Sequence, residues 1–152
     1  MKKLHSVIII IMFVSGFFVS CNKKDDTINE PPEITILHPV DNDTVKAGGS
    51  FEMEIVLSDA GGLHQCVVEV HNNFDNHTHQ AAKNAEITGE PWLYHRGYTF
   101  NGETSQTLHE VINVPLLIGN EPIARGKYHF YVTIEDIQGL MVLASKNIII
   151  GG

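Results

Sequence analysis

The densest group of possible metal ligands lies between residues 64 and 79, in the stretch HQCVVEVHNNFDNHTH. It contains four of the nine histidines, one cysteine and one aspartate. Imidazole is the commonest protein ligand for transition metals, and His77 and His79 would point the same way on an extended chain. The stretch therefore predicts a metal site. The alternative is a solvated loop that is rich in histidine.

A second group of side chains combines a histidine with aromatic rings. His95 lies among Trp92, Tyr94 and Tyr98 in the sequence PWLYHRGYTF. Aromatic rings in a loop could stack on a sugar or cover the histidine site. The alternative is that Trp92 and Tyr94 close one end of a hydrophobic core.

Two aspartates in turns suggest a different kind of ion. Asp59 and Asp136 each follow a strand-like run and lie before glycine-containing turns. Calcium prefers about six to eight oxygen ligands, and two carboxylates fall short of that number. The sequence alone therefore does not favour a calcium site.

The candidate nucleophiles have no catalytic context. Ser58 and Ser145 lack a nucleophile-elbow motif, and no histidine is spaced to orient either of them. Cys66 alternates with Val68 and Val70, which predicts a thiol that is buried in the core. We therefore expect a protein that is not an enzyme.

Short runs in which apolar and polar residues alternate recur along the chain, with turn residues between them. Examples are SFEMEIVLS and KYHFYVTIE. They predict seven strands, at residues 34–37, 51–57, 65–71, 93–100, 107–114, 128–135 and 140–150. The alternation leaves the register of the last strand open. This pattern is typical of an all-β protein, an antiparallel β-sandwich of about seven strands over residues 33–152.

Such a sandwich would bring two histidines together. The strands at residues 65–71 and 128–135 correspond to antiparallel neighbours of one sheet. His71 ends the first strand and His129 begins the second, and both face outward because Val70, Tyr128 and Phe130 face the core. Facing residues have Cβ atoms about 4.5–5.5 Å apart. Two imidazoles at that spacing can share a zinc ion at Zn–N distances of about 2.0–2.1 Å.

The polar turn after this strand supplies further ligands. Asp75, His77 and His79 leave from the end of the strand that carries His71 and can fold back over it. The predicted metal ligands are therefore His71, His77, His79, His129 and Asp75. All-imidazole ligation suits Zn²⁺, and Cu²⁺ is the alternative.

The N-terminus has the pattern of an exported lipoprotein. Lys2 and Lys3 precede an uncharged apolar run that is shorter than the roughly 20 residues of a membrane-spanning helix. FVSC, which ends at Cys21, resembles the lipobox of bacterial lipoproteins, although Phe18 stands where leucine is usual. We expect a lipoprotein signal peptide at residues 1–20, lipidation at Cys21 and a lipidated flexible tether at residues 21–32.

The charge of the chain restricts its partners. Removal of residues 1–20 would leave 8 basic and 18 acidic residues, a net charge of −10 with neutral histidine. Such a charge argues against binding to nucleic acid or to anionic lipid headgroups. It attracts cations to the surface, but only weakly and without selection.

Several motifs also resemble known modules. EITILHP, the segment around LSDAGGL and the segment GKYHFYVTIED resemble the Ig-like and cadherin-like sandwiches of bacterial surface proteins. VEVHNNFDNHTH together with GKYHF is similar to an uncharacterised family of Ig-like Bacteroidetes lipoproteins, a domain of unknown function with a VxIHxNFDxHxH-like motif. The resemblance covers about residues 32–151 and implies a lipid-anchored protein of the outer membrane, exposed at the cell surface. It implies no activity.

Three functional hypotheses follow from the sequence. The first is a surface lipoprotein that binds Zn²⁺ or Cu²⁺ for capture or delivery, next to an outer-membrane transporter. The second is an Ig-like adhesion or scaffold module that binds a glycan or a protein. The third is a purely structural zinc that fixes the long segment from Asn72 to Tyr98.

Overall fold

The computed structural model describes residues 30–73 and 88–152, and within these ranges all regular structure is β-strand. The strands are β1 (Glu33–His38), β2 (Asp43–Lys46), β3 (Ser50–Ser58), β4 (Leu63–Asn72), β5 (Tyr94–Thr99), β6 (Ser105–Asn113), β7 (Leu117–Ile118), β8 (Glu121–Pro122), β9 (Gly126–Asp136) and β10 (Met141–Gly151). In the described part of the chain, no helix is long and apolar enough to cross a membrane.

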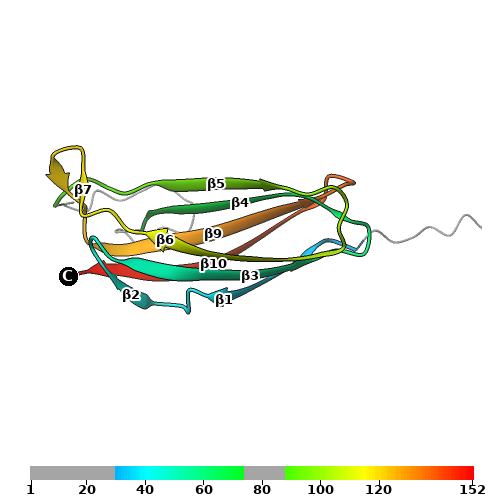
Figure 1. The fold of residues 1–152 in the computed structure, drawn as a ribbon, viewed down its shortest axis with the longest axis horizontal. Coiled ribbons are helices and arrows are strands. Elements are labelled where there is room, and N and C mark those ends of the chain that lie inside the picture. Colours follow the sequence, from blue (N-terminus) through cyan, green and yellow to red (C-terminus); the bar gives the residue numbers. More distant parts are fainter. Residues whose placement is uncertain (1–29, 74–87) are drawn as a thin grey trace, which may run out of the picture.

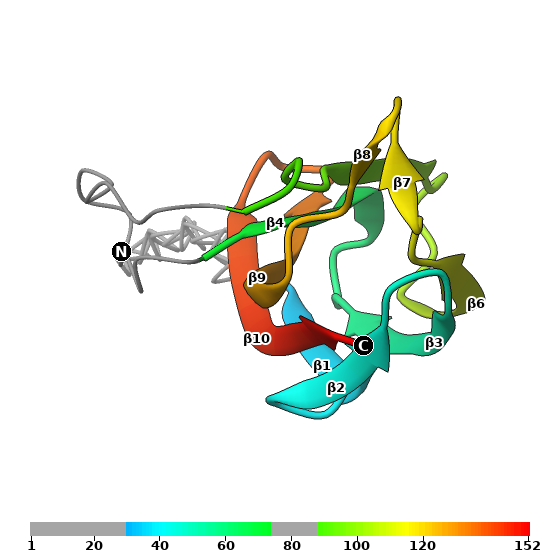
Figure 2. The same cartoon turned by 90° about the vertical axis from the view of Figure 1, so that its left-hand side faces the viewer.

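Two sheets face each other in a sandwich, as Figures 1 and 2 show. One sheet has the strand order β1-β3-β6, and the other has the order β2-β10-β9-β4-β5. The pairings are antiparallel except that β2 runs parallel to β10. A separate hairpin, β7–β8, lies at one end of the sandwich (Figure 1). The predicted all-β sandwich is confirmed.

The seven predicted strands are all present, and the three additional ones are short. β2 has four residues, and β7 and β8 have two each. Alternation needs several positions to become visible, and in β2 only Val45 is buried. The sequence pattern therefore detects the long strands and misses the short ones.

The core lies between the two sheets and follows the period of two in the strands. Alternate residues point to opposite faces of a sheet, so one side of each strand is buried. The last strand is now placed: Ile148 and Ile150 face the core, and Ile149 faces outward. The fully buried side chains include Met53, Ile55, Leu57, Leu63, Val68, Val70, Tyr128, Phe130, Val132 and Ile134.

Aromatic residues close one end of this core. The Tyr128 hydroxyl donates a hydrogen bond of 2.7 Å to the Ala124 carbonyl and accepts one of 3.3 Å from the Trp92 amide. The Trp92 ring is buried and lies 6.3 Å from the Tyr128 ring and 6.0 Å from the Tyr94 ring, between centroids. Trp92 is therefore a core residue, as the second interpretation of the aromatic cluster predicts.

A matched pair of valine substitutions measures how strongly the core holds the fold. Val68 is fully buried in β4, whereas Val111 on β6 is 58% exposed. We expect Val68→Ala to lower the free energy of unfolding by about 2 kcal/mol, because buried methyl groups are lost and a cavity remains. Val111→Ala carries the same change in strand propensity and should stay within about 0.5 kcal/mol of the unsubstituted protein. Urea denaturation compares them, and equal losses would contradict this assignment of the core.

Candidate metal site

His71 and His129 are direct neighbours across two strands. β4 pairs antiparallel with β9, and the register places His71 opposite His129. Each position is set by its neighbours in sequence, because Val70, Tyr128 and Phe130 are fully buried and the residues between them must face outward. The predicted pairing of these two strands is confirmed.

The two imidazole rings lie close enough to share an ion. Their centroids are 5.5 Å apart, and the rings are at 80° to each other. The centroid of an imidazole lies about 3.2 Å from a zinc ion that the ring binds, so two imidazoles at a tetrahedral angle have centroids about 5 Å apart. The observed centroid separation of 5.5 Å is close to this value.

Tyr131 adds a third ring to this pair. Its ring stacks on His71 at 5.0 Å and 19°, and it meets the edge of His129 at 5.1 Å. The Tyr131 hydroxyl and His129 Nδ1 lie 3.1 Å apart in a hydrogen bond. Burial raises the pKa of the Tyr131 hydroxyl, so it stays protonated at neutral pH. We define His71, His129 and Tyr131 as the ring cluster.

The hydrogen bond to Tyr131 bears on which nitrogen of His129 can bind a metal. Metal-binding histidines usually donate their second ring N–H to a neighbouring acceptor, and this bond fixes the tautomer and the ring orientation. If His129 Nδ1 carries the proton and donates it to the Tyr131 oxygen, Nε2 is the nitrogen with the lone pair. Tyr131 was not among the predicted site residues, although its position two residues after His129 puts both side chains on one face.

Two asparagines and an aspartate lie beside the paired histidines. Asn147 of β10 is the register partner of His129, and its amide nitrogens donate to Asp41 Oδ1. The backbone hydrogen bond from Asn147 is the main cause that lowers the pKa of Asp41. Asn73 donates from Nδ2 to Asn147 Oδ1 at 3.5 Å. The Asp41 carboxylate is therefore bound to the residue that pairs with His129.

The side-chain oxygen of Asn73 is buried and has no hydrogen-bond partner among the described residues. A buried carbonyl oxygen without a partner is costly, and a donor or a cation would remove that cost. The unpaired Asn73 oxygen is thus a second polar feature of this end of β4, besides the two imidazoles.

An ion pair between Glu69 and His95 lies on the same face of the sheet as the ring cluster. Glu69 is the register partner of both Tyr131 on β9 and His95 on β5. His95 Nδ1 and Glu69 Oε1 lie 3.2 Å apart, and both side chains are exposed. Glu69 was not predicted, although it precedes His71 by two positions. Its exposure makes the pair a weak contributor to stability.

The remaining predicted ligands are not part of the described structure. Asp75, His77 and His79 lie within residues 74–87, outside the described ranges. Within those ranges, no three His, Cys, Asp or Glu side chains are grouped so that they could hold a metal ion. The described part of the site is thus a two-histidine half-site with Tyr131 beside it.

Other residues that the sequence singled out lie elsewhere. Cys66 is fully buried, and burial raises the pKa of its thiol to about 12, so at neutral pH it is no nucleophile. Asp136 closes the β9–β10 turn by accepting from the amides of Gln138 and Leu140, each at 2.8 Å. The predicted signal peptide and lipidation site, residues 1–20 and Cys21, lie outside the described residues.

Comparison with solved structures finds distant likenesses. The sporulation control protein Spo0M from Bacillus subtilis shares 6% identity at a TM-score of 0.47, over 81% of this chain and 50% of that one. A β-glucosidase from Listeria innocua shares 10% at 0.40, over 79% and 16%. The CARDB domain of PF1109 from Pyrococcus furiosus, in complex with di-metal ions, shares 16% at 0.33, over 79% and 90%. The chain thus spans half of Spo0M and a sixth of the β-glucosidase, and these likenesses carry no argument about function.

Comparison by sequence gives a family. No protein with a curated description matches the chain. A family model described as a domain of unknown function, DUF4625, matches residues 19–151. This range contains both sheets and the ring cluster, and it agrees with the expected resemblance to an uncharacterised domain family. The chain belongs to the DUF4625 family.

Proposed function

We propose that this protein is a lipid-anchored surface module that binds one Zn²⁺ ion, with Cu²⁺ as the alternative, for capture or delivery next to an outer-membrane transporter. The observation that carries the proposal is the juxtaposition of His71 and His129, with ring centroids 5.5 Å apart. Neutral imidazoles are ligands for both ions, and nothing in the ring cluster selects between them.

Two imidazoles need partners to complete a four-coordinate ion. His77 and His79 follow His71 by six and eight positions in the sequence. An extended chain covers up to about 3.3–3.6 Å per residue, so six residues can reach roughly 20 Å. Chain length therefore permits both histidines, and Asp75 with them, to join His71 and His129 on one ion.

The proposed Ig-like character of the sandwich rests on two features. β4 and β9 pair as strands C and F do in such modules, and Tyr128 near the start of β9 bonds back to the carbonyl of Ala124. A tyrosine at this corner with that bond is a hallmark of Ig-like folds. Ig-like modules serve as rigid carriers, and here the carrier would present the ring cluster on one outer face of the sheet.

The proposed location rests on the sequence alone. The apolar run at residues 1–20, the FVSC motif and Cys21 together support export and acylation. Residues 21–32 would then link the lipid to β1. A lipid anchor at the outer membrane would hold a metal-binding domain close to a transporter.

A second candidate function is adhesion or scaffolding through a protein contact. Leu93 is 68% exposed before β5, and Leu116 and Leu117 are exposed at β7. A backbone bridge joins Glu90, three residues before Leu93, to Ile123, whose amide donates to the Leu116 carbonyl at 3.1 Å. The adjoining strand β7 lies at one end of the sandwich (Figure 1). Exposed apolar side chains that gather in this way favour a protein partner over a glycan. In this function any metal would be purely structural.

Removal of the paired histidines tests the metal site. We expect the untagged protein to bind one Zn²⁺ per chain with a dissociation constant below about 10 μM, and His71→Ala or His129→Ala to weaken binding at least tenfold. His109→Ala is the matched control, because His109 is exposed on β6 in the other sheet. Isothermal titration calorimetry measures the unsubstituted protein, the three single variants and the double variant at positions 71 and 129. Unchanged binding in the double variant at positions 71 and 129 would refute the role of the ring cluster.

Removal of one hydroxyl tests the role of Tyr131. Tyr131→Phe keeps the ring that stacks on His71 but loses the bond to His129 Nδ1. We expect zinc affinity to fall by about tenfold, with unchanged stoichiometry, because the orienting contact of the ligand is lost. Competition with a zinc-sensitive fluorescent chelator measures the affinity. If the affinity is unchanged while the free energy of unfolding drops, Tyr131 serves only packing.

Replacement of the predicted lipidated cysteine tests the location. With Cys21→Ser expressed in its native host, we expect loss of fatty-acid labelling and release of the protein from the membrane fraction. Cys66→Ser is the control, since Cys66 is buried in the core and should leave labelling intact. Labelling with a fatty-acid analogue followed by cell fractionation gives both readouts. Persistent labelling of the Cys21→Ser protein would contradict the anchor.

A further inference from the structure

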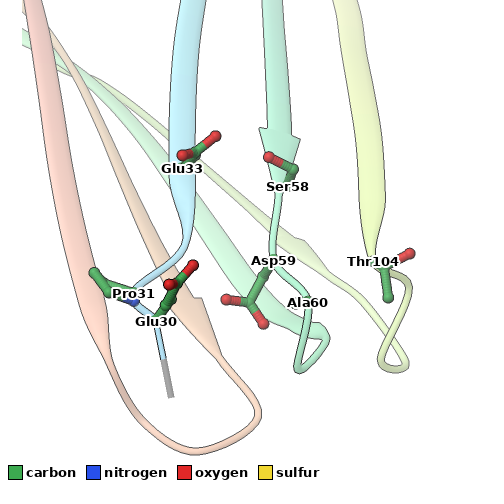
Figure 3. Close-up of a pocket in the computed structure, with 7 residues that line it drawn as sticks. All are labelled: Glu30, Pro31, Glu33, Ser58, Asp59, Ala60 and Thr104. Carbon is green, nitrogen blue, oxygen red and sulfur yellow. The ribbon is translucent and has the colours of Figure 1, made fainter. Parts of the chain in front are cut away.

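An acidic pocket lies at the end of the sandwich opposite the ring cluster. It has a volume of about 220 Å³ and lies between the segment that enters β1 and the turn after β3. Its lining includes three carboxylates, from Glu30, Glu33 and Asp59, and the hydroxyl-bearing residues Ser58 and Thr104. Figure 3 shows the side chains of Glu30 and Asp59 directed into the same space. The lining contains no basic residue.

Asp59 is held rigidly at the base of this pocket. Its backbone amide donates to the Thr104 carbonyl at 3.0 Å, and its Oδ1 accepts from the Gly62 amide at 2.7 Å. Gly62 has φ +112°, and a Cβ there would lie 2.9 Å from the Gly102 carbonyl oxygen, so only glycine fits. The turn therefore fixes the direction of the Asp59 carboxylate.

The second oxygen of Asp59 has no hydrogen-bond partner. Asp59 is only 6% exposed, and its Oδ2 is unpaired within the described part of the chain. A buried carboxylate oxygen without a donor or a cation is strongly destabilising. Because Glu30 and Glu33 line the same pocket, the neighbouring groups increase the negative charge instead of compensating it. A bound cation would remove this penalty.

The chemistry of the lining selects the kind of cation. Among the described residues that line the pocket, all side-chain ligands are oxygens, and none is an imidazole or a thiol. Oxygen ligands suit hard ions such as Ca²⁺ and Mg²⁺ and disfavour the softer transition metals. Ca²⁺ accepts irregular coordination with waters among its ligands, whereas Mg²⁺ demands a near-ideal octahedron. An open pocket with one fixed carboxylate therefore fits Ca²⁺ better.

We propose that this pocket is a calcium site in which Asp59 Oδ2 is the fixed ligand and the Glu30 carboxylate is the second. Water and the nearby oxygens of the lining complete the coordination. In the described ranges the three carboxylates do not form a ready three-ligand group, so binding requires Glu30 to move onto the ion. We therefore expect the weak affinity of extracellular calcium modules, a dissociation constant of about 0.1–1 mM.

Calcium at this position would have a structural consequence. Glu30 precedes β1, whereas Asp59 follows β3, so one ion would join two segments that are 29 positions apart in the sequence. The ion would fix the direction in which the chain enters the sandwich. It would leave the ring cluster at the other end unaffected.

A titration of amide chemical shifts tests the site. The full-length chain, isotope-labelled and kept in a non-ionic detergent, is titrated with CaCl₂ and separately with MgCl₂ at constant ionic strength. We expect Ca²⁺ to shift the amides of Asp59, Ala60, Gly62 and Thr104 with one saturating curve. Asp59→Asn keeps an oxygen for the Gly62 amide while removing the charge, and Glu30→Gln changes an exposed residue. Each should weaken calcium binding at least tenfold.

Glu121→Gln is the matched control, because Glu121 is an exposed carboxylate on β8, at the far end of the molecule in Figure 1. It should bind calcium as the unsubstituted chain does. Shifts that spread over many surface carboxylates, or that Mg²⁺ reproduces equally, would overturn the proposal as a general attraction of cations. Absence of saturation at about ten times the weakest expected dissociation constant would overturn it as well.

Discussion

The antiparallel pairing of β4 with β9 is the constraint on which the rest of the molecule depends. Its register puts Val68 opposite Val132 and Val70 opposite Phe130, and all four side chains are fully buried. Because side chains alternate along a strand, the same register puts His71 opposite His129 on the other face. A slip of one residue would expose the core and separate the histidines. The core thus specifies the geometry of the ring cluster.

This coupling explains why half of the candidate site could be predicted from the sequence. The positions of His71 and His129 follow from the alternation of their neighbours, and alternation is a local property. The spacing places Tyr131 on the same face as His129, but it does not reveal the hydrogen bond between them, which depends on side-chain rotamers. The bond from Asn73 to Asn147 joins residues 74 positions apart, and no spacing rule reveals it either. The short strand β2 depends on pairing with β10, more than 100 positions later in the chain. Features that depend on local alternation could be predicted from the sequence, whereas contacts that depend on three-dimensional packing could not.

Asp59 illustrates the same limit at the other end of the sandwich. The sequence shows Asp59 before a glycine-rich turn and Asp136 before another turn, and these two aspartates were the pair considered for an ion. The structure instead uses Asp136 to close the β9–β10 turn, and it brings Glu30 and Glu33 to Asp59 through the pairing of β1 with β3. Those residues are distant in sequence, so only the folded chain shows which carboxylates share a pocket.

The two ends of the sandwich therefore offer different chemistry to different ions. The ring cluster at one end contains imidazoles, which suit zinc or copper, and the described lining of the pocket at the other end offers only oxygens, which suit calcium. Both sites would take their rigid members from strands or turns that the hydrophobic core positions without help from metal. The core between the two sheets includes buried apolar side chains of β3, β4, β9 and β10. A metal at the ring cluster would then add binding energy to a domain that is already folded, through RT ln(1 + [L]/Kd). A domain that folds without the ion can release it and stay folded, whereas a domain that needs the ion in order to fold cannot.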